Sequence, residues 1–283
     1  MPDAVCRKKM FSEAYKLASK YTFPVLISSK LMDGTLESGV GAFVIINEDG
    51  WFITAAHMLN GMMAHQQHVA QYQEYLNQKT QTTLSPNPKW ILQHSLWFGA
   101  DNHKVNNFHI LKDNDLAVGK IENFNSGLIK NYPRFIRPEN VIPGTSLCKL
   151  GFPFYDVAVN FNESMRSFVY DQSIFPIPMF PMEGIMTRNV LSGNSPDGKF
   201  EYKWLETSSP GLRGQSGGPT FDRYGNIWAL QSQTRHLPLG FSPKVNKNGI
   251  EIEENQFLNV GWGVHADTIT KFLDFHGVKY YSA

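Results

Sequence analysis

The chain has 283 residues, of which 42% are hydrophobic and 13% aromatic, so it can form an apolar core and is not intrinsically disordered. Its 26 Lys and Arg residues nearly balance 25 Asp and Glu residues, which leaves a formal charge of +1. This balance excludes a polybasic nucleic-acid-binding protein and an acidic, solvating chain.

The first segment of the chain, Met1 to Lys20, contains basic residues but lacks the apolar core of a secretory signal. No stretch approaches the roughly 18 consecutive apolar residues of a membrane-spanning helix. The two cysteines, Cys6 and Cys148, allow at most one disulfide bond. We therefore expect a cytoplasmic protein with reduced thiols that binds neither membranes nor nucleic acid.

The first half of the chain combines one short helix with a series of strands. Apolar residues at helical spacing predict a helix over Met10 to Lys20. Short runs rich in β-branched and aromatic residues then predict strands at Val25 to Ile27, Val40 to Ile46, Trp51 to Thr54, Trp90 to Phe98, Val105 to Leu111 and Leu116 to Ile121. The turn sequence Asn47 to Gly50 predicts a hairpin between the second and third of these strands.

Two segments interrupt this series of strands. Residues 60–83 are rich in Gln, His, Met and Tyr, and contain no Pro or Gly between Met62 and Thr83, which predicts a helical insertion. The polar stretch from Asn123 to Pro143 is the best internal boundary. We expect one domain over residues 1–283, with barrel halves at 22–122 and 141–265 and a helix and tail at 266–283.

The second half of the chain repeats the strand pattern. Short runs bounded by Gly, Pro, Asn or Asp predict strands at Ser146 to Leu150, Met165 to Tyr170, Gly184 to Val190, Phe200 to Glu206, Pro219 to Asp222, Ile227 to Ser232 and Phe257 to Val264. A helix follows over Asp267 to His276, with Asp267 as its predicted cap. Two groups of short strands predict an all-β protein with paired β-barrels.

Three local motifs carry residues suited to catalysis. They are Thr54 to His57 directly after an apolar strand, Asn114 to Val118 with an acid at the start of a strand, and Gly214 to Pro219 with a serine in a glycine-rich turn. Each motif alone is more often an ordinary turn, cap or core histidine. The order His, Asp, Ser, with every residue at a strand end, makes that interpretation of the set improbable.

The chemistry explains why these residue types belong together. A serine hydroxyl needs a base to take its proton as it attacks, and neutral imidazole suits that role near neutral pH. A carboxylate on the other ring nitrogen orients the imidazole and stabilises its charged form. Glycines let the backbone N–H groups of Gly214 and Ser216 converge on one point, where they can bind an oxyanion.

From Pro24 to His276 the sequence resembles the trypsin-like, chymotrypsin-fold serine peptidases, and within them a bacterial branch of HtrA-like and glutamyl-endopeptidase-like enzymes. The three motifs match the family's histidine, acid and nucleophile motifs. The resemblance implies two six-stranded antiparallel Greek-key barrels, with an N-terminal helix, a helical insertion and a C-terminal helix. It also implies a serine endopeptidase in which His57 is the base, Asp115 the orienting acid and Ser216 the nucleophile, with an oxyanion hole made by Gly214 and Ser216.

Activation is where the sequence departs from the family. Members that are activated by cleavage have an acid just before the serine, which pairs with the new N-terminus, whereas this chain has Gln215. We therefore expect an enzyme that is organised without trimming, or one that a regulatory protein partner controls. The insertion after His57 either borders the substrate site or packs at the periphery.

The resemblance also locates a pocket for the substrate side chain that precedes the scissile bond. The residues expected to line it are Pro210, Leu230, Gln231, Ser232, Gly263 and His265. Pro210 offers no acid that would select Lys or Arg. His265 at the pocket floor would favour acidic or polar side chains, but a hydrogen bond within the barrel is the slightly favoured role for it.

Three other interpretations compete with a peptidase that acts on a peptide or protein. His65 and His68 have the spacing of a helical metal-ligand pair, but no acid or cysteine completes a set, so a solvated helix face is favoured and neither metal nor other cofactor is expected. Cys148 lies in the middle of a strand, where a buried structural thiol is normal. The remaining alternative is a protease-fold module that binds peptides or partners with little or no turnover.

Overall fold

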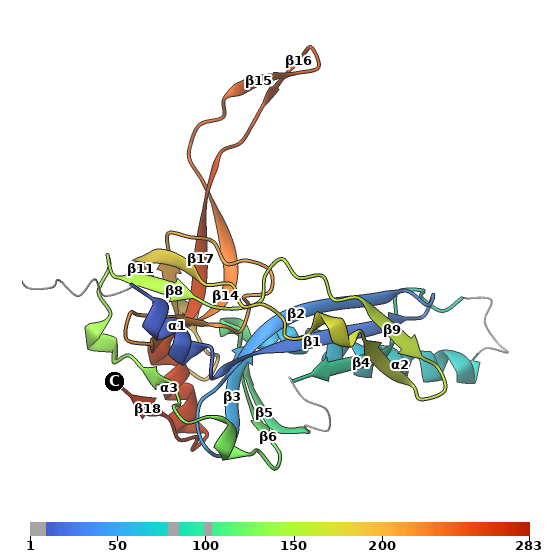
Figure 1. The fold of residues 1–283 in the computed structure, drawn as a ribbon. Helices are drawn as coiled ribbons and strands as arrows, with labels where there is room; N and C mark the ends of the chain where they lie inside the picture. Colours follow the sequence, from blue (N-terminus) through green and yellow to red (C-terminus); the bar gives the residue numbers. More distant parts are fainter. Residues whose placement is uncertain (1–9, 79–84, 99–103) are drawn as a thin grey trace, which may run out of the picture.

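The computed structural model describes residues 10–78, 85–98 and 104–283, without the side chains of 106 and 107, and is mostly β (Figure 1). Two sheets, in which most strands pair antiparallel, contain most of the strand residues of the described chain. Cys6 lies outside the described residues, and Cys148 is a free, buried thiol. Among the described helices, none has both the length and the apolar character needed to cross a membrane.

The first sheet contains six antiparallel strands in the order β4-β1-β2-β3-β6-β5. Their bounds are β1 Thr22–Leu31, β2 Leu36–Ile45, β3 Trp51–Ala55, β4 Ile91–Trp97, β5 Val105–Leu111 and β6 Leu116–Ile121. The predicted hairpin is confirmed, since β2 and β3 pair on either side of Asn47 to Gly50. The outer strands β4 and β5 are not paired in the part of the chain that the structure describes, so this sheet stays open.

The second sheet closes into a six-stranded antiparallel barrel. The ring runs β13-β8-β11-β12-β17-β14 and returns to β13. Its strands are β8 Ser146–Lys149, β11 Met182–Asn194, β12 Glu201–Thr207, β13 Pro219–Phe221, β14 Asn226–Pro238 and β17 Phe257–His265. The prediction of a mostly β protein with two groups of short antiparallel strands is therefore confirmed.

In three respects the architecture differs from two closed antiparallel barrels. The first sheet is open, and two short strands, β7 Arg134–Phe135 and β18 Tyr281–Ser282, add to the second sheet in parallel. Two separate hairpins also form, from β9 Val159–Asn162 with β10 Ser167–Tyr170, and from β15 Lys244–Lys247 with β16 Ile250–Glu253. The second hairpin continues β14 and β17 into an arm that stands away from the body (Figure 1).

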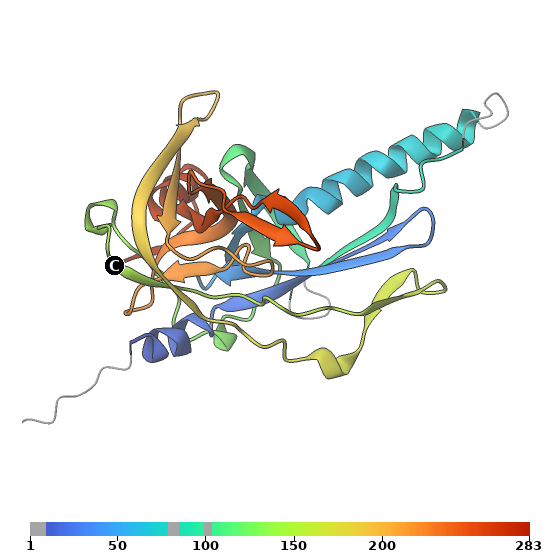
Figure 2. The ribbon, with the colours of Figure 1, turned by 90° about the horizontal axis from the view of Figure 1, so that it is seen from above.

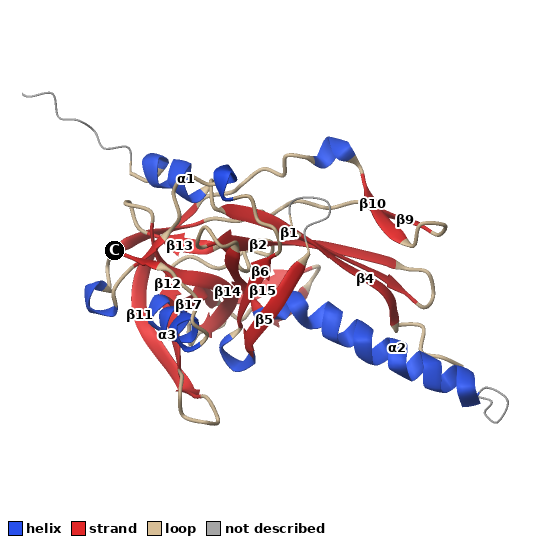
Figure 3. Ribbon diagram, turned by 90° about the horizontal axis from the view of Figure 1, so that it is seen from below, coloured by secondary structure: helices blue, strands red, loops and turns tan. Residues whose placement is uncertain are grey.

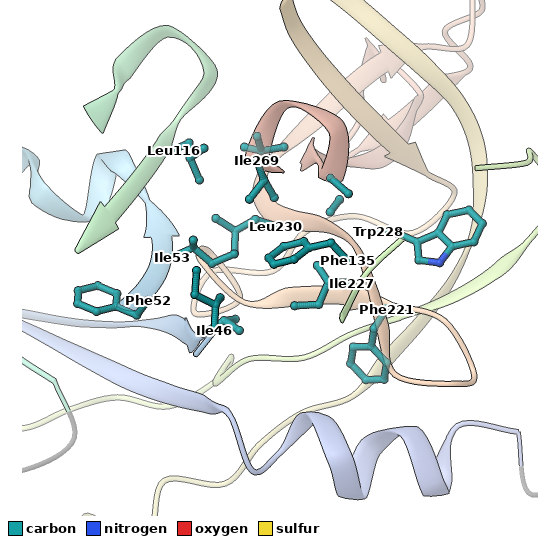
Figure 4. Close-up of a cluster of buried hydrophobic side chains, with 14 of the residues drawn as sticks. Ile46, Phe52, Ile53, Leu116, Phe135, Phe221, Ile227, Trp228, Leu230 and Ile269 are labelled. Atoms are coloured by element: carbon teal, nitrogen blue, oxygen red, sulfur yellow. The ribbon is translucent and has the colours of Figure 1, made fainter. Parts of the chain in front are cut away.

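A continuous apolar core joins the two sheets. Phe52, Ile53 and Leu116 of the first sheet are fully buried in the same cluster as Leu230 of the second sheet and Ile269 of the C-terminal helix. Figure 4 shows these side chains converging between the strands. Because protein interiors are densely packed and have low compressibility, this core fixes the two sheets relative to each other.

Three α-helices lie around the sheets, α1 Ser12–Ala18, α2 Asn60–Gln78 and α3 Ala266–Phe275. Short 3₁₀ helices fill several turns, η1 Ala56–Leu59, η2 Lys112–Asn114, η3 Ser126–Leu128, η4 Pro138–Asn140 and η5 Gln172–Ile174. The helical insertion is confirmed over its described part. Seen from above, α2 extends with the long ends of β1 and β2 to one side of the closed barrel (Figure 2).

The cap of α3 differs from the sequence prediction. His265, not Asp267, is the N-cap, because the helix begins at Ala266 and His265 Nδ1 accepts a hydrogen bond of 3.0 Å from the Asp267 amide. His265 is fully buried, and burial lowers its pKa to about 4. Its ring is therefore neutral in the folded state near neutral pH.

Replacing this histidine should weaken the acid sensitivity of the fold. The pKa of His265 is lower in the folded state than the roughly 6.5 of an unfolded histidine, so its contribution to stability is lost as pH falls from about 6.5 to about 4. That difference corresponds to about 3 kcal/mol. His265→Asn keeps a capping acceptor. Urea unfolding at several pH values should show that its free energy of unfolding falls less with decreasing pH than that of the wild type. The control variant His236→Asn, at an exposed histidine, should show the same pH dependence as the wild type. If the free energy of unfolding of His265→Asn depends on pH as that of the wild type does, this account is contradicted.

Candidate active site

His57 stands at the point where β3 passes into η1. The Thr54 hydroxyl donates a 2.8 Å hydrogen bond to the Ala42 carbonyl on β2, and the Ala56 amide donates one of 3.0 Å to the Asp115 carbonyl. Ala55 and Ala56 are buried. These contacts hold the backbone on both sides of His57, so its ring projects from a fixed position.

Asp115 follows η2 at the start of β6 and has a left-handed backbone with φ +54°, a conformation that aspartate tolerates better than most residues. Its carboxylate accepts two 2.8 Å hydrogen bonds from His57, one from the amide and one from Nδ1. The Ser232 hydroxyl on β14 donates a third, short hydrogen bond to the same carboxylate. The carboxylate therefore orients the His57 ring and bonds to the second sheet as well.

Ser216 lies in the glycine-rich turn between the two sheets. The Ala42 amide on β2 donates to its carbonyl at 2.8 Å, and Gly217 and Gly218 each share a 2.8 Å backbone hydrogen bond with Gln231 on β14. The Ser216 hydroxyl donates to the Ser232 carbonyl at 3.2 Å. Among the described residues the structure has no hydrogen bond between Ser216 and His57.

The turn before Ser216 presents backbone amides. The Gln215 amide donates to the Leu212 carbonyl at 2.9 Å, and Gly214 has φ +96°, which is typical of the third position of a type II turn. The Gln215 side chain accepts a 3.0 Å hydrogen bond from the Leu212 amide. In the described chain no intramolecular hydrogen bond engages the amides of Gly214 and Ser216, so both can bind an oxyanion.

A groove of about 350 Å³ borders this turn. Its lining includes Val40 on β2, Phe154, Asp156, and the turn residues Arg213 and Gly214. Phe154 is 79% exposed and has φ +62°, an uncommon conformation for a bulky residue. The groove provides space for an extended segment beside the amide of Gly214.

All of the residues predicted for the side-chain pocket except Pro210 are buried. Pro210, Ser232 and Gly263 lie on the segment before the turn and on the paired strands β14 and β17. Leu230 and Gln231 are buried in β14, and the Gln231 amide group donates to the Gln233 and Trp262 carbonyls at 3.1 and 3.2 Å. His265 is not on an open pocket floor, because it is fully buried and caps α3.

Two features of this region differ from the expectations drawn from the sequence. Ser232 is expected only as a pocket residue, whereas its hydroxyl bonds to Asp115. Lys149 was not singled out, yet it is fully buried and its Nζ donates to the carbonyls of Ser209 and Pro210, the latter at 2.8 Å. A charged residue between Cys148 and Leu150 in an apolar strand was the available signal for Lys149.

The two histidines of α2 do not form a solvated face, which corrects that expectation. His65 Nε2 lies 3.1 Å from the Leu92 carbonyl, and His68 Nδ1 accepts from the Ile91 amide at 3.0 Å. Both therefore join α2 to β4, along which the helix runs outward from the sheets (Figure 3). No cluster of possible metal ligands occurs in the described part of the chain.

Comparison with known proteins identifies a family. Residues 39–230 match the family model of the trypsin-like peptidase domain. The comparison with curated proteins gives no match. Among solved structures, the HtrA-type protease AlgW with tripeptide is similar, at 14% sequence identity and a TM-score of 0.47. That match covers 95% of this chain and 64% of the other chain, so this chain spans less than two thirds of its length.

The close packing around Gly214 gives a test of the turn geometry. A Cβ at Gly214 would overlap the Phe152 carbonyl, whereas one at Gly144, with a similar φ of +88°, would meet nothing within 4 Å. In both alanine variants the free energy of unfolding should fall by roughly 1–2 kcal/mol, because alanine is strained in a left-handed backbone conformation. The free energy of unfolding of Gly214→Ala should fall by at least about 1 kcal/mol more than that of Gly144→Ala, because of the overlap with the Phe152 carbonyl. Equal losses in urea unfolding would show that the turn is not packed in this way.

Proposed function

The chain belongs to the family of trypsin-like peptidase domains, and on that premise we propose that it is a serine endopeptidase. It hydrolyses peptide bonds of a peptide or protein substrate through His57, Asp115 and Ser216 and an acyl-enzyme intermediate. The single observation that carries this proposal is the double hydrogen bond from His57 to the Asp115 carboxylate. No metal or other cofactor takes part in the proposed reaction.

The role of the double hydrogen bond is to select the useful tautomer of His57. With its proton on Nδ1, facing the carboxylate at 2.8 Å, the ring has its Nε2 lone pair free to accept a proton. The carboxylate then stabilises the imidazolium that forms. Such an arrangement supplies a base near neutral pH without any bound ion.

In the proposed reaction the Ser216 hydroxyl turns from the Ser232 carbonyl to His57 Nε2. This requires rotation of one side chain, and such hydrogen bonds often tighten only when substrate is bound. Oγ attacks the substrate carbonyl while its proton passes to Nε2, and His57 later gives that proton to the leaving amine. The amides of Gly214 and Ser216 stabilise the oxyanion, at about 2.7–4 kcal/mol per donor.

Gln215 supports an enzyme that is organised without N-terminal cleavage. Its side-chain oxygen accepts from the Leu212 amide and thereby closes the turn that carries Gly214. A neutral amide that makes this bond has no need of a newly formed ammonium group as its partner. We therefore assign regulation, where it occurs, to a protein partner or to the substrate.

A covalent probe tests the proposal directly. A fluorophosphonate should label the unprocessed wild-type protein, and Ser216→Ala should abolish labelling because the attacking oxygen is gone. Peptide turnover should fall by at least about 10⁴-fold in Ser216→Ala and His57→Ala. Ser164→Ala, on an exposed turn, is the matched control and should label normally. A folded wild type that binds peptides but never labels would favour the peptide-binding module instead.

Ser232→Ala tests the contact between the sheets. Loss of a hydrogen bond to a charged group costs about 1.5–3 kcal/mol, so kcat should fall by about 10- to 100-fold while probe labelling persists at a lower rate. Ser28→Ala removes an equally buried hydroxyl that bonds to Tyr170 on the β9–β10 hairpin and should leave kcat within about twofold of wild type. If both variants keep the wild-type kcat, Ser232 does not help to orient the acid.

A further inference from the structure

Lys149 is a fully buried lysine that has no counter-ion among the described residues. Its side chain is 0% exposed, and in the described part of the chain it forms no salt bridge. Its Nζ donates to the carbonyls of Ser209 and Pro210, which leaves one of its three N–H groups without an acceptor. A buried charge that is not neutralised is costly, and burial accordingly lowers the pKa of Lys149 to about 7.

The ammonium lies beside the segments that flank the reacting serine. Pro210 is the residue six positions before Ser216, and a side chain at Gly261 would overlap Lys149 Nζ. Gly261 pairs with Thr234 on β14, two residues beyond Ser232, whose carbonyl accepts from the Ser216 hydroxyl. Lys149 Nζ therefore lies between residues 209–210 and the paired strands β14 and β17.

Side-chain contacts join Gly211 to β14 beside Lys149. The Thr234 hydroxyl donates to the Gly211 carbonyl, and a Cβ at Gly211 would overlap the Gln231 amide group. Neither contact is part of a strand-pairing ladder. For a substrate side chain to reach Lys149, the side chains of Thr234 and Gln231 have to rotate away from Gly211.

We propose that Lys149 determines specificity by binding the carboxylate of an Asp or Glu side chain that immediately precedes the scissile bond. A carboxylate supplies the charge and the acceptor that Lys149 lacks, and a hydrogen bond between two charged groups is among the strongest in proteins. This inference rests on the proposed function, because it names the substrate class of that site.

The test uses four peptides that differ only in the residue before the scissile bond, which is Glu, Asp, Gln or Leu. For the wild-type protein, kcat/KM with the better acidic peptide should exceed that with the Gln peptide at least tenfold. Lys149→Met keeps the length of the side chain without its charge, so this ratio should fall below one. Lys203→Met removes a lysine of the same barrel that already faces Asp267 and should keep the wild-type ratio.

Fluorophosphonate labelling of Ser216 separates failure of this inference from failure of the proposed function, since the probe carries no residue for the pocket. Labelled wild type without a preference for the acidic peptides overturns the inference. A Lys149→Met variant that is labelled and still prefers the acidic peptides also overturns the inference. If Lys149→Met does not fold, the inference is tested by the wild type alone, through the ratio of kcat/KM with the better acidic peptide to kcat/KM with the Gln peptide. Absence of labelling in the wild type overturns the proposed function itself.

Discussion

The arrangement of the site depends on the hydrogen bonds that the Asp115 carboxylate accepts. It accepts hydrogen bonds from the His57 amide and ring on the first sheet and from the Ser232 hydroxyl on the second. One acidic side chain thus orients the proposed base and bonds across the boundary between the sheets. The shared core, with Ile53 and Leu230 in one cluster, keeps that boundary in place, so the carboxylate meets both partners without further adjustment.

The turn that carries Ser216 is held from several sides. Its backbone bonds to Ala42 on β2 and to Gln231 on β14, and a Cβ at Gly217 would overlap the Ala42 carbonyl. Glycine is therefore required there by close backbone approach as well as by conformation. Because both sheets hold this turn, the distance between Ser216 and the His57 side of the site is set by the packing of the whole molecule.

The strands β14 and β17 serve two parts of the protein. Near the core they carry Ser232 and Gly261, which border the proposed substrate pocket. Farther out the same pair continues into the arm with β15 and β16 (Figure 1). Lys149 lies where these strands meet β8 and the segment before the turn. A buried lysine without a counter-ion weakens a fold, and a substrate carboxylate would supply that counter-ion, which is the physical basis for assigning Lys149 a role in substrate selection.

Much of this protein followed from local sequence. The strand positions and the hairpin at Asn47 to Gly50 depend on residue patterns that act over a few neighbours, and the order of His57, Asp115 and Ser216 in their motifs indicated the proposed chemistry. The contacts of Ser232, Lys149 and His265 did not follow. Each depends on which strands become neighbours across long separations in the chain, and sequence periodicity carries no information about that.

The sequence by itself thus determined the residue types available for catalysis and the strands that present them. Only the tertiary structure decided that one sheet closes while the other stays open. It also decided that Ser232 reaches Asp115 and that His265 caps α3 rather than facing an open pocket. The physical reason is that hydrogen-bonded pairing and close packing are properties of elements brought together in space, whereas a motif specifies only its own segment.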